Sequence, residues 1–564
     1  MQLRLPLWLY LFVAVVVAVA EGQDGSRLVT IDQGPVRGQK IQQTDIYGFF
    51  GIPYATEPTG NDKFKAPLPP PSWTDTFEAT NQFIACLQSE QLPRSDNCLI
   101  ANVYVPETNK TDLPVMVIVH GGGFQTGSAF FGSPLNLIEI SDIIVVTFNY
   151  RLGVYGFLCL GNEDVPGNAG MKDQVAALRW INRNIRQFGG NPDDVTLTGC
   201  SAGGVSVDLL RIVNVTDGLF NKVITGSGAP LGPFSVQVDP IENAKIYARE
   251  LGFDNVDDIK ALTEFYINAT HEFLMSEANA IINRPDGSVL FIPCVEKDIG
   301  DEIFLVEAPI DIIRNGIVKA LPVLYGLADK EGLMFMNDFE KWQNMMNENF
   351  VPFIPVDLKI ESSEEREAVA NQIKEFYFGD APVTEASFLS MVDYFSDIVF
   401  VYSMLKSVKL HADASNESKF YLYEYSLIHP TFSKPGADHC DQFILIFDEN
   451  DSNLPEDYRN ITAIMKKLYT DFITTGNPVP EGSVLPAWPP ANASRDPHMA
   501  IGSSISLEGP LYKRRAEFWD QLYEKYYRAP GPPSNNANVL RVIAVWTCSL
   551  VFLLNNVSII GRFF

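Results

Sequence analysis

The chain has 564 residues, with 42 Lys or Arg against 69 Asp or Glu, so its formal net charge at neutral pH is −27. This charge argues against a nucleic-acid-binding surface and a polybasic membrane patch, since both need clustered positive charge. Hydrophobic residues make up 46 % and charged residues 20 %, which is typical of a folded protein. The 7 cysteines are too sparse for a small disulfide scaffold, so the composition indicates a large globular chain.

Residues 1–20 have the pattern of a cleaved secretory signal peptide. Arg4 precedes an almost wholly apolar run, and Ala18-Val19-Ala20 forms a small-residue cleavage site before a polar stretch. A membrane anchor is the alternative, but the apolar run is short for a bilayer span. We therefore expect the folded domain to begin at Glu21 and to enter an oxidising, glycosylating compartment.

Asn-x-Ser/Thr motifs support a secreted or extracellular glycoprotein, because such motifs are modified only in that compartment. Each motif alone is weakly specific, since many acceptors stay unmodified. Six lie between the two hydrophobic ends of the chain, at Asn109, Asn214, Asn268, Asn416, Asn460 and Asn492, and a seventh, Asn556, lies in the C-terminal tail.

The central part of the chain alternates strand and helix patterns. Residues 115–119 and 143–147 are continuous apolar runs, as buried strands are, and residues 175–188 have a helical pattern. A further buried strand is predicted at 321–326. This alternation predicts an α/β fold, with a mostly parallel twisted sheet and helices on both faces. The segments between 205 and 320 and between 340 and 430 mix helices and loops, and we expect them to be cap insertions and side elements.

A Gly-x-Ser-x-Gly motif indicates a serine nucleophile. Gly199-Cys200-Ser201-Ala202-Gly203 follows a short predicted strand at 195–198 and precedes a helical stretch at 204–212. At such a turn the serine hydroxyl is lifted out of the sheet, and the N–H of Ala202 is directed at a substrate oxygen.

A glycine loop after another strand strengthens this interpretation. The strand at 115–119 ends in His120-Gly121-Gly122-Gly123-Phe124. Three successive glycines let backbone N–H groups approach a ligand unhindered. We therefore predict an oxyanion hole formed by the N–H groups of Gly122, Gly123 and Ala202.

The C-terminal end contains a Pro- and Asn-rich linker at 529–538 and a hydrophobic tail at 539–564. The tail fits a glycosylphosphatidylinositol (GPI) anchor signal, with small residues between Ser534 and Ala537 as the attachment site. Alternatively, residues 539–560 span the bilayer as a helix of about 33 Å, or the tail packs on the domain. Either membrane interpretation leaves the globular part outside the cell.

Motifs along residues 25–528 resemble, in order, those of the type-B carboxylesterase and cholinesterase family. Besides the two glycine motifs they include Phe50-Gly51-Ile52-Pro53-Tyr54-Ala55, Asp96-Asn97-Cys98-Leu99, Tyr150-Arg151-Leu152-Gly153 and Phe188-Gly189-Gly190-Asn191-Pro192. The resemblance implies an α/β-hydrolase fold with helical cap insertions over residues 21–528. It also implies hydrolysis of carboxylic esters by a serine esterase without a metal or an organic cofactor.

The resemblance supplies the other two members of a catalytic triad. The family's acid matches Glu331, in Gly326-Leu327-Ala328-Asp329-Lys330-Glu331-Gly332, and its histidine matches His439, in Gly436-Ala437-Asp438-His439-Cys440-Asp441. We expect the neighbouring Asp329 and Asp441 to be solvated or to stabilise loops. The other histidines outside the glycine loop are expected to be surface or helix residues: His271, His411, His429 and His498.

Cysteine positions give a further expectation. The resemblance implies a disulfide between Cys86 and Cys98, whereas the family's second pair has no clear match. Cys200 and Cys440 each stand beside a predicted triad residue. A disulfide between them is one hypothesis, and two free buried thiols are the interpretation that the sequence favours, because sequence alone gives no Cα separation.

Departures from the family limit the substrate class. Cholinesterases have an acidic residue where this chain has Cys200, and the loop between Cys86 and Cys98 contains no aromatic residue to bind a quaternary ammonium. Juvenile-hormone esterases usually have Gln at that position. The chain is therefore more similar to secreted or antennal insect carboxylesterases, and neutral lipophilic esters are predicted: odorant, pheromone, hormone or xenobiotic esters.

We expect four side chains to line the substrate pocket, namely Phe124, Cys200, Ser227 and Phe304. The predicted partners are a small lipophilic ester and a membrane tether, and the sequence does not indicate an oligomeric state. The alternative function is a catalytically silent cell-surface adhesion ectodomain of the same family. An intact triad and glycine loop favour the enzyme, because adhesion does not require an assembled site.

Overall fold

A computed structural model describes residues 25–88, 97–130, 132–276, 284–316, 318–414, 418–447 and 453–534. The predicted signal peptide, the hydrophobic tail and the sequons at Asn416 and Asn556 lie outside the described residues.

One sheet runs through the molecule in the order β1-β2-β3-β5-β7-β6-β8-β9-β10-β11-β12-β13, and β4 pairs with β2. The strands are β1 (Ser26–Ile31), β2 (Gly34–Lys40), β3 (Ile46–Pro53), β4 (Phe77–Glu78), β5 (Ile100–Pro106), β6 (Leu113–Val119), β7 (Ile144–Phe148), β8 (Gly190–Cys200), β9 (Lys222–Gly226), β10 (Val323–Ala328), β11 (Phe420–Tyr425), β12 (His498–Ile501) and β13 (Ile505–Glu508).

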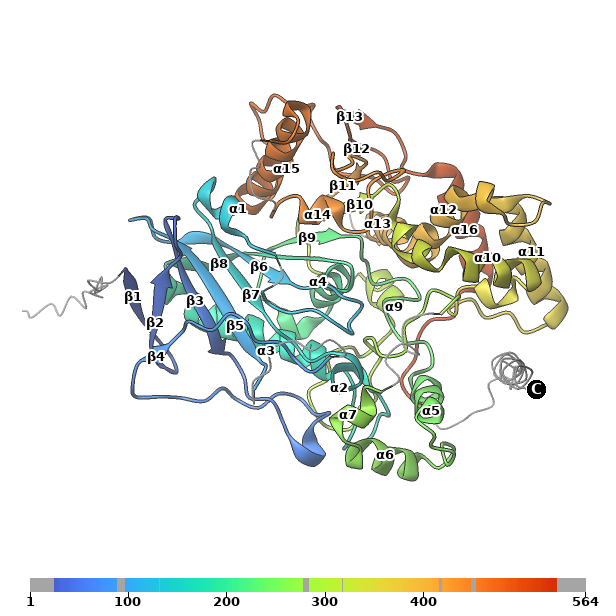
Figure 1. Ribbon diagram of the computed structural model, residues 1–564, viewed down its shortest axis with the longest axis horizontal. Coiled ribbons are helices and arrows are strands. Elements are labelled where there is room, and N and C mark those ends of the chain that lie inside the picture. The colour runs from blue at the N-terminus through green and yellow to red at the C-terminus, as the bar shows by residue number, and fades with distance from the viewer. Residues whose placement is uncertain are drawn as a thin grey trace, which may run out of the picture.

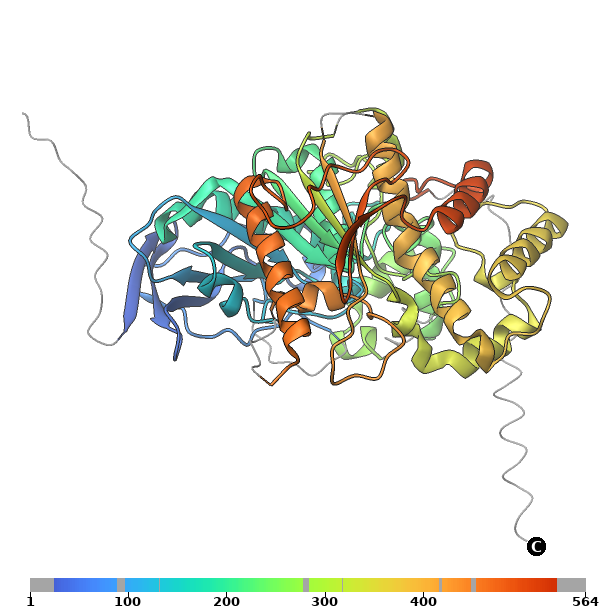
Figure 2. The ribbon, with the colours of Figure 1, turned by 90° about the horizontal axis from the view of Figure 1, so that it is seen from above.

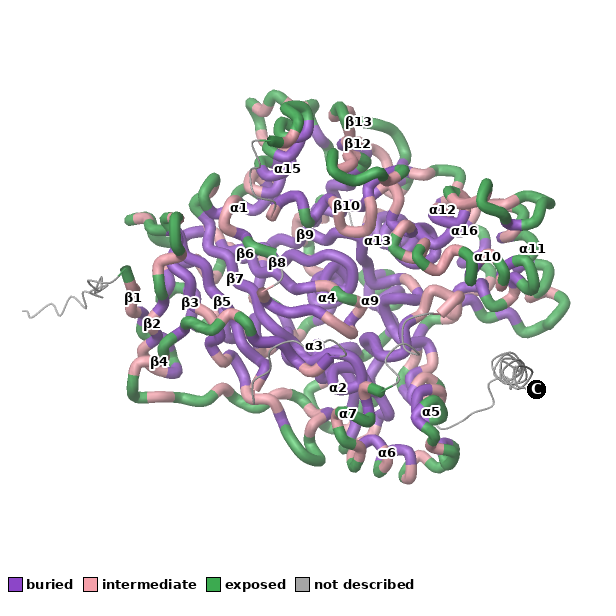
Figure 3. Tube along the Cα trace, viewed as in Figure 1, coloured by how far each residue is buried: buried purple, intermediate pink, exposed green. Residues whose placement is uncertain are grey.

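The central strands are parallel, as the sequence predicts. β7, β6, β8, β9, β10, β11 and β12 are paired in parallel. On the N-terminal side, β1, β2, β3, β5 and β7 are paired antiparallel, and the short β4 pairs in parallel with β2. Val117 of β6 lies opposite Val146 of β7 and Leu197 of β8, and all three are fully buried. Figure 3 shows this buried central sheet beneath more exposed peripheral helices. Strands covered on both faces have no reason to alternate polar and apolar residues, which explains their continuous apolar runs.

Helices cover both faces and extend one end of the molecule. They are α1 (Leu135–Glu139), α2 (Gly153–Phe157), α3 (Ala169–Asn184), α4 (Ala202–Ile212), α5 (Pro240–Glu250), α6 (Ile259–Asn268), α7 (His271–Leu274), α9 (Pro309–Arg314), α10 (Phe339–Glu348), α11 (Ser363–Phe378), α12 (Phe388–Ser396), α13 (Tyr402–Ala414), α14 (Asp441–Ile444), α15 (Glu456–Thr475) and α16 (Lys513–Tyr526). Strands β1 to β4 lie at one end of the molecule, and α10, α11 and α16 lie at the other (Figures 1 and 2).

The helical stretch Glu385–Ala414 is long and apolar enough to cross a membrane, and it is the only such stretch within the described ranges. However, 78 % of its most apolar window is buried inside the domain. It therefore has the character of a core helix, because a helix that is apolar on most sides must be covered by protein or by lipid.

Two predictions of local structure need correction. The segments 205–320 and 340–430 are not only cap and side elements, since each contributes a strand to the central sheet, β9 and β11. β9 has five residues and begins with Lys222, and β11 is dominated by tyrosine. Such short runs acquire their strand character from neighbours on both sides rather than from their own pattern. The predicted helix at 175–188 begins earlier, at Ala169, and ends in a 3₁₀ turn at Ile185–Phe188.

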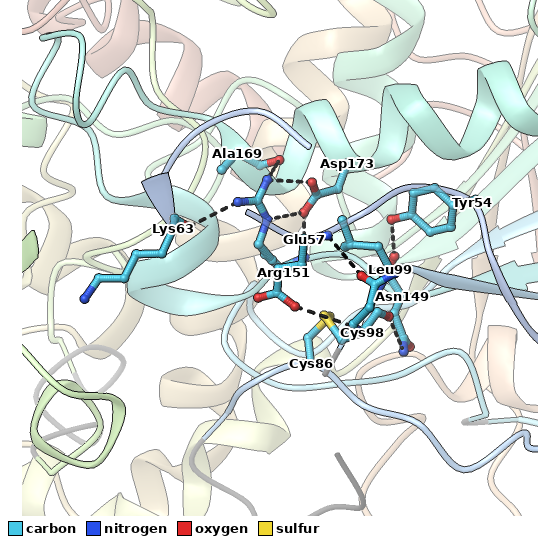
Figure 4. A network of polar contacts seen from close by, with 11 residues as sticks. Tyr54, Glu57, Lys63, Cys86, Cys98, Leu99, Asn149, Arg151, Ala169 and Asp173 are labelled. Carbon is cyan, nitrogen blue, oxygen red and sulfur yellow. Dashed lines mark hydrogen bonds and ion pairs between the residues drawn. A yellow bond between two sulfur atoms is a disulfide. The ribbon is translucent and has the colours of Figure 1, made fainter. Parts of the chain in front are cut away.

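A buried ion pair fixes α3 beneath the loop that follows β7. Arg151 Nη2 lies 2.7 Å from Asp173 Oδ1, and the two side chains are 1 % and 0 % exposed. Arg151 Nε donates to Asp173 Oδ2 over 2.8 Å, and Nη1 donates to the carbonyl of Lys63 over 3.1 Å. Figure 4 shows this pair beside Tyr54, whose hydroxyl donates to the carbonyl of Asn149 over 2.6 Å. Tyr54 and Arg151, which belong to two of the sequence motifs, therefore lie in one network of structural contacts rather than at a ligand site.

We expect Asp173→Ala to lower the free energy of unfolding by about 3–5 kcal/mol, because it removes the carboxylate that pairs directly with the buried Arg151 guanidinium. Denaturant unfolding measures the loss. The control is Glu302→Ala, which removes an exposed ion pair with Arg179 (2.8 Å, side chains 50 % and 40 % exposed) and should cost less than about 1 kcal/mol. Equal losses in the two variants would contradict this account.

Candidate active site

Ser201 sits at the turn between β8 and α4 in a strained backbone conformation. Its φ of 60° and ψ of −129° are rare for a residue with a side chain. The flanking glycines are required by close packing: a Cβ at Gly203 would lie 2.2 Å from the carbonyl oxygen of Val119, and one at Gly199 would lie 2.5 Å from the backbone of Gly203. The Ser201 N–H donates to the carbonyl of Gly226 over 2.9 Å, which ties the turn to the end of β9.

The glycine loop lies directly against this turn. A Cβ on Gly121 would be 3.2 Å from Ser201 Cβ and 2.7 Å from the carbonyl oxygen of Cys200. Gly122 and Gly123 adopt φ values of 103° and 62°, which glycine tolerates. Ala202 is the first residue of α4, where a backbone N–H has no partner within the helix. The structure thus places Gly121, the first glycine of the loop, against the turn that carries Ser201 and Ala202.

His120 supports the loop as a neutral ring. Burial lowers the pKa of His120 to about 4. Its Nδ1 lies 2.9 Å from the carbonyl oxygen of Gly121, which fixes the Nδ1–H tautomer, and its ring stacks on Tyr150 with centroids 4.3 Å apart. Tyr150 also donates its hydroxyl to the carbonyl of His120 over 2.9 Å. The loop is therefore fixed by stacking and hydrogen bonds, without a charge beside the site.

Glu331 and His439 form a direct pair. Glu331 follows β10, is fully buried, and its Oε2 lies 2.6 Å from His439 Nδ1. Its Oε1 accepts hydrogen bonds from the Ser227 hydroxyl (2.6 Å) and from the N–H of Ala328 (2.7 Å). His439 Nε2 is buried without a hydrogen-bond partner in the part of the chain that the structure describes. Because Glu331 occupies Nδ1, Nε2 is the ring nitrogen left to accept a proton.

We expected Ser227 to line the substrate pocket. The structure places it instead against the Glu331 carboxylate, at the oxygen that does not contact His439. It is fully buried, donates to Glu331, and its oxygen accepts from Gln442 Nε2 over 2.6 Å. Its hydroxyl therefore donates a hydrogen bond to the Glu331 carboxylate. Once that carboxylate is removed from water, each of its oxygens needs a partner. Gln442 was missed by the sequence reasoning, although it lies only three residues after His439.

Three disulfides are formed within the part of the chain that the structure describes. Cys86 and Cys98 are bonded, as the resemblance implies, and Cys159 and Cys294 form a second pair that the sequence did not indicate. Cys200 and Cys440 are also bonded, with Cα atoms 6.1 Å apart, so the favoured interpretation of two free thiols is wrong. These last partners are 240 residues apart in sequence, and only the tertiary fold brings them within bonding distance.

Aromatic rings lead away from His439. Phe400 stacks on the imidazole with centroids 4.1 Å apart, and it contacts Phe234 at 5.6 Å. Phe234 in turn contacts Phe124, a predicted pocket residue, at 6.1 Å. Phe400 lies in a π-helical turn, Asp397–Val401, between α12 and α13, and no sequence motif marked it. The fourth predicted pocket residue, Phe304, is buried in the main core, and its N–H donates to Glu296 over 2.8 Å.

The remaining histidines mostly match expectation. His271 and His411 lie in α7 and α13, and His429 is partly exposed. His498 differs: it starts β12, is buried, and its Nδ1 lies 2.6 Å from the carbonyl oxygen of Gly509. Within the described ranges, no group of three His, Cys, Asp or Glu side chains is arranged to hold a metal ion.

Asp329 and Asp441 stabilise loops, as expected. Asp329 Oδ1 accepts the N–H of Ala437 over 2.8 Å, and Asp441 Oδ2 accepts the N–H of Asp438 over 2.8 Å. Both contacts lie in or on the loop that carries His439. Burial raises the pKa of Asp329 to about 6 and also raises the pKa of Asp441.

A serine on a strained strand–helix turn, a glycine loop beside it and a Glu–His pair after later parallel strands define an α/β-hydrolase. The carboxylesterase family model matches residues 25–519. Esterase FE4 of Myzus persicae is 33 % identical over 476 residues, covering 79 % of this chain and 83 % of that protein. Venom carboxylesterase-6 of Apis mellifera is 31 % identical over 537 residues, covering 87 % and 93 % of the two chains.

Solved structures agree. The juvenile hormone esterase of Manduca sexta, with OTFP covalently attached, superposes with a TM-score of 0.77 at 28 % identity and covers 88 % of this chain and 99 % of its own. A PNB esterase structure gives a TM-score of 0.71 at 27 % identity, covering 87 % and 99 % of the two chains. This chain belongs to the carboxylesterase family. It is a carboxylic ester hydrolase that acts on small ester substrates.

Asp329→Asn should stabilise the fold above neutral pH. The folded pKa, about 6, exceeds the ordinary value of 3.8, so the folded state favours the protonated acid and loses stability as pH rises from 4 through 6. Asparagine keeps the acceptor for Ala437 without the charge. We expect the variant to gain up to about 3 kcal/mol at pH 8 and nothing at pH 4. Unfolding midpoints across this pH range test it, and a gain independent of pH would contradict it.

Proposed function

We propose that Ser201, Glu331 and His439 are the catalytic triad of an extracellular enzyme that hydrolyses neutral lipophilic carboxylic esters. The observation that carries the proposal is the 2.6 Å contact between Glu331 and His439 Nδ1, with Nε2 buried and unpartnered among the described residues. That arrangement leaves a base beside a serine turn in a member of a family of ester hydrolases.

The chemistry follows from these positions. His439 Nε2 takes the proton of the Ser201 hydroxyl as Oγ forms a bond to the ester carbonyl carbon. The N–H groups of Gly122, Gly123 and Ala202 hold the resulting oxyanion, each contributing about 3 kcal/mol. His439 then protonates the departing alcohol as the C–O bond breaks. A water molecule repeats the sequence on the acyl-enzyme, releasing the acid and restoring Ser201.

Glu331 fixes the reactive form of the base. Its contact with Nδ1 holds the proton on that nitrogen and leaves Nε2 as acceptor, and its charge stabilises the imidazolium that forms. Ser227 and Ala328 satisfy the other carboxylate oxygen, so the acid keeps one orientation.

A neutral lipophilic substrate suits the surroundings. The rings of Phe400, Phe234 and Phe124 form a continuous series of contacts that begins at His439. Cys200, which stands beside the nucleophile, is bonded to Cys440 and carries no charge to attract a cation. Apolar acyl or alcohol groups gain free energy by burial against such rings. Odorant, pheromone, hormone and xenobiotic esters are all of this class.

Disulfides and sequons support an extracellular location. Three disulfides are expected only in an oxidising compartment. Five predicted acceptors are exposed and therefore accessible to glycosylation: Asn109, Asn214, Asn268, Asn460 and Asn492. We propose that residues 21–528 form the secreted domain and that the C-terminal tail specifies a lipid anchor.

Ser201→Ala should abolish turnover of short-chain p-nitrophenyl and naphthyl esters, with a loss of at least about 10³-fold in kcat, because no other group replaces the nucleophile. A fluorophosphonate probe should label the wild type on Ser201 and leave the variant unlabelled. Ser206→Ala is the control, since Ser206 lies in α4, the helix that follows Ser201, but is fully buried and accepts a hydrogen bond from Gln174 over 3.2 Å.

A folded wild-type protein with neither turnover nor label would contradict the proposed triad. It would favour the alternative of a silent adhesion ectodomain.

The tether is tested separately on cells that express the full chain. If the tail directs a GPI anchor, phosphatidylinositol-specific phospholipase C should release most surface esterase activity into the medium. Retention after that treatment would indicate a transmembrane span instead. Activity in the medium before treatment would contradict both forms of membrane attachment.

A further inference from the structure

We propose that the Cys200–Cys440 disulfide is a positioning element of the active site, which holds His439, the proposed base, against the turn that carries Ser201. The inference rests on the proposed roles of these two residues. It assigns to the cross-link an effect on the rate of the chemical step, beyond any effect on the stability of the fold.

The cross-link joins the immediate neighbours of nucleophile and base. Cys200 is the last residue of β8 and precedes Ser201, while Cys440 precedes α14 and follows His439. Their Cα atoms are 6.1 Å apart. Any movement of the His439 loop away from the serine turn must therefore stretch or rotate this one bond.

The hydrogen bonds of the His439 loop, residues 436–442, join it to segments around the ends of β9 and β10. The N–H of Ala437 donates to Asp329, the N–H of Lys330 donates to the carbonyl of Ala437, and His439 contacts Glu331. Gln442 reaches Ser227, which follows β9. Between residues 436–442 and the serine turn at 199–203, both fully described, the structure contains no hydrogen bond. The disulfide is thus the direct link from base to nucleophile.

The backbone at Cys440 gives an independent reason to assign it a role. Its φ of 66° and ψ of 6° lie in the left-handed region, where glycine is the residue without a steric penalty. A cysteine here opposes the local preference. The side chain makes a bond that glycine is unable to make, which accounts for its presence at this position.

The serine side of the bond is also closely packed. Cys200 is 4 % exposed, and a Cβ added to Gly226 would lie 3.2 Å from its Sγ and 3.3 Å from Gln442 Nε2. The disulfide therefore lies in a gap that the absent side chain of Gly226 leaves open. Such packing restricts the sulfur to a narrow range of positions.

The consequence for the reaction is specific. Proton transfer needs Oγ and Nε2 within about 2.6–3.2 Å, and a displacement of about 1 Å is able to cost about 10²-fold in rate. Substrate contacts with the aromatic rings do not depend on this bond. Its loss should therefore lower kcat and leave KM nearly unchanged.

The test compares the full-length wild type with Cys200→Ala, Cys440→Ala and the double variant. Active sites are counted by fluorophosphonate labelling, and kcat is expressed per active site, so that unfolded molecules do not contribute. We expect kcat to fall by at least about tenfold with KM within about threefold, since misalignment affects the transition state. The double variant should be no slower than the slower single variant, because either change removes the same bond.

The control is the double variant Cys159→Ala/Cys294→Ala. That disulfide also closes a long loop, with a sequence separation of 135 against 240, so its effect on the unfolded chain is similar. It should lower the thermal midpoint without changing kcat per active site. Cys440→Gly provides a second comparison, because it relaxes the left-handed backbone and still removes the bond. It should be as slow as Cys440→Ala.

Reduction tests the native protein without substitution. A trialkylphosphine and one water convert the disulfide to two thiols and the phosphine oxide, the phosphorus supplying two electrons. Peptide mapping of alkylated aliquots should show that loss of kcat follows reduction of Cys200 and Cys440, and reoxidation of a sample that has not been alkylated should restore kcat. The Cys200→Ala/Cys440→Ala variant should not respond.

Unchanged kcat per active site in the double variant, or in the reduced wild type, would overturn the positioning role. A wild type with neither turnover nor label would overturn the proposed triad, and this inference with it.

Discussion

The carboxylate of Glu331 is the group on which the site depends. It is fully removed from water, so each oxygen must find a protein partner or destabilise the fold. His439 Nδ1 takes one oxygen, and Ser227 with the N–H of Ala328 takes the other. Ser227 follows β9, Ala328 is the last residue of β10, and His439 lies on its own loop. Satisfying one buried charge therefore fixes the relative positions of three segments that are distant in sequence.

Close backbone approach is the second constraint. The serine turn, the glycine loop and the start of α4 contact one another at distances that leave no space for a Cβ at Gly121, Gly199 or Gly203. Ser201 keeps an unfavourable φ because the strand and the helix on either side define its position. The glycine pattern thus reflects the lack of space for side chains where β6, β8 and α4 meet.

The compartment and the chemistry are linked through the cysteines. In an oxidising environment the fold gains three disulfides among its described residues, one of which joins the neighbours of Ser201 and His439. The same environment allows glycosylation of the exposed Asn-x-Ser/Thr motifs. Phe400, stacked on His439, gives the imidazole an aromatic cover.

The sequence by itself determined the α/β class, the serine turn, the glycine loop and the candidates Glu331 and His439. These features depend on local requirements: apolar runs for buried strands, glycine where backbones touch, and ordered motifs at fixed spacing. The Glu331–His439 contact, with its partner Ser227, is a property of the folded chain, although the motifs named both ends of it.

Only the tertiary structure shows which residues connect segments that are distant in sequence. The strand character of β9 and β11, the Cys200–Cys440 and Cys159–Cys294 pairs, the true position of Ser227 and the stacking of Phe400 on His439 all depend on packing between elements far apart in sequence. A short strand, a lone cysteine or a phenylalanine in a helical run has the same local pattern whatever it contacts. The contact is set by three-dimensional proximity, which local spacing does not encode.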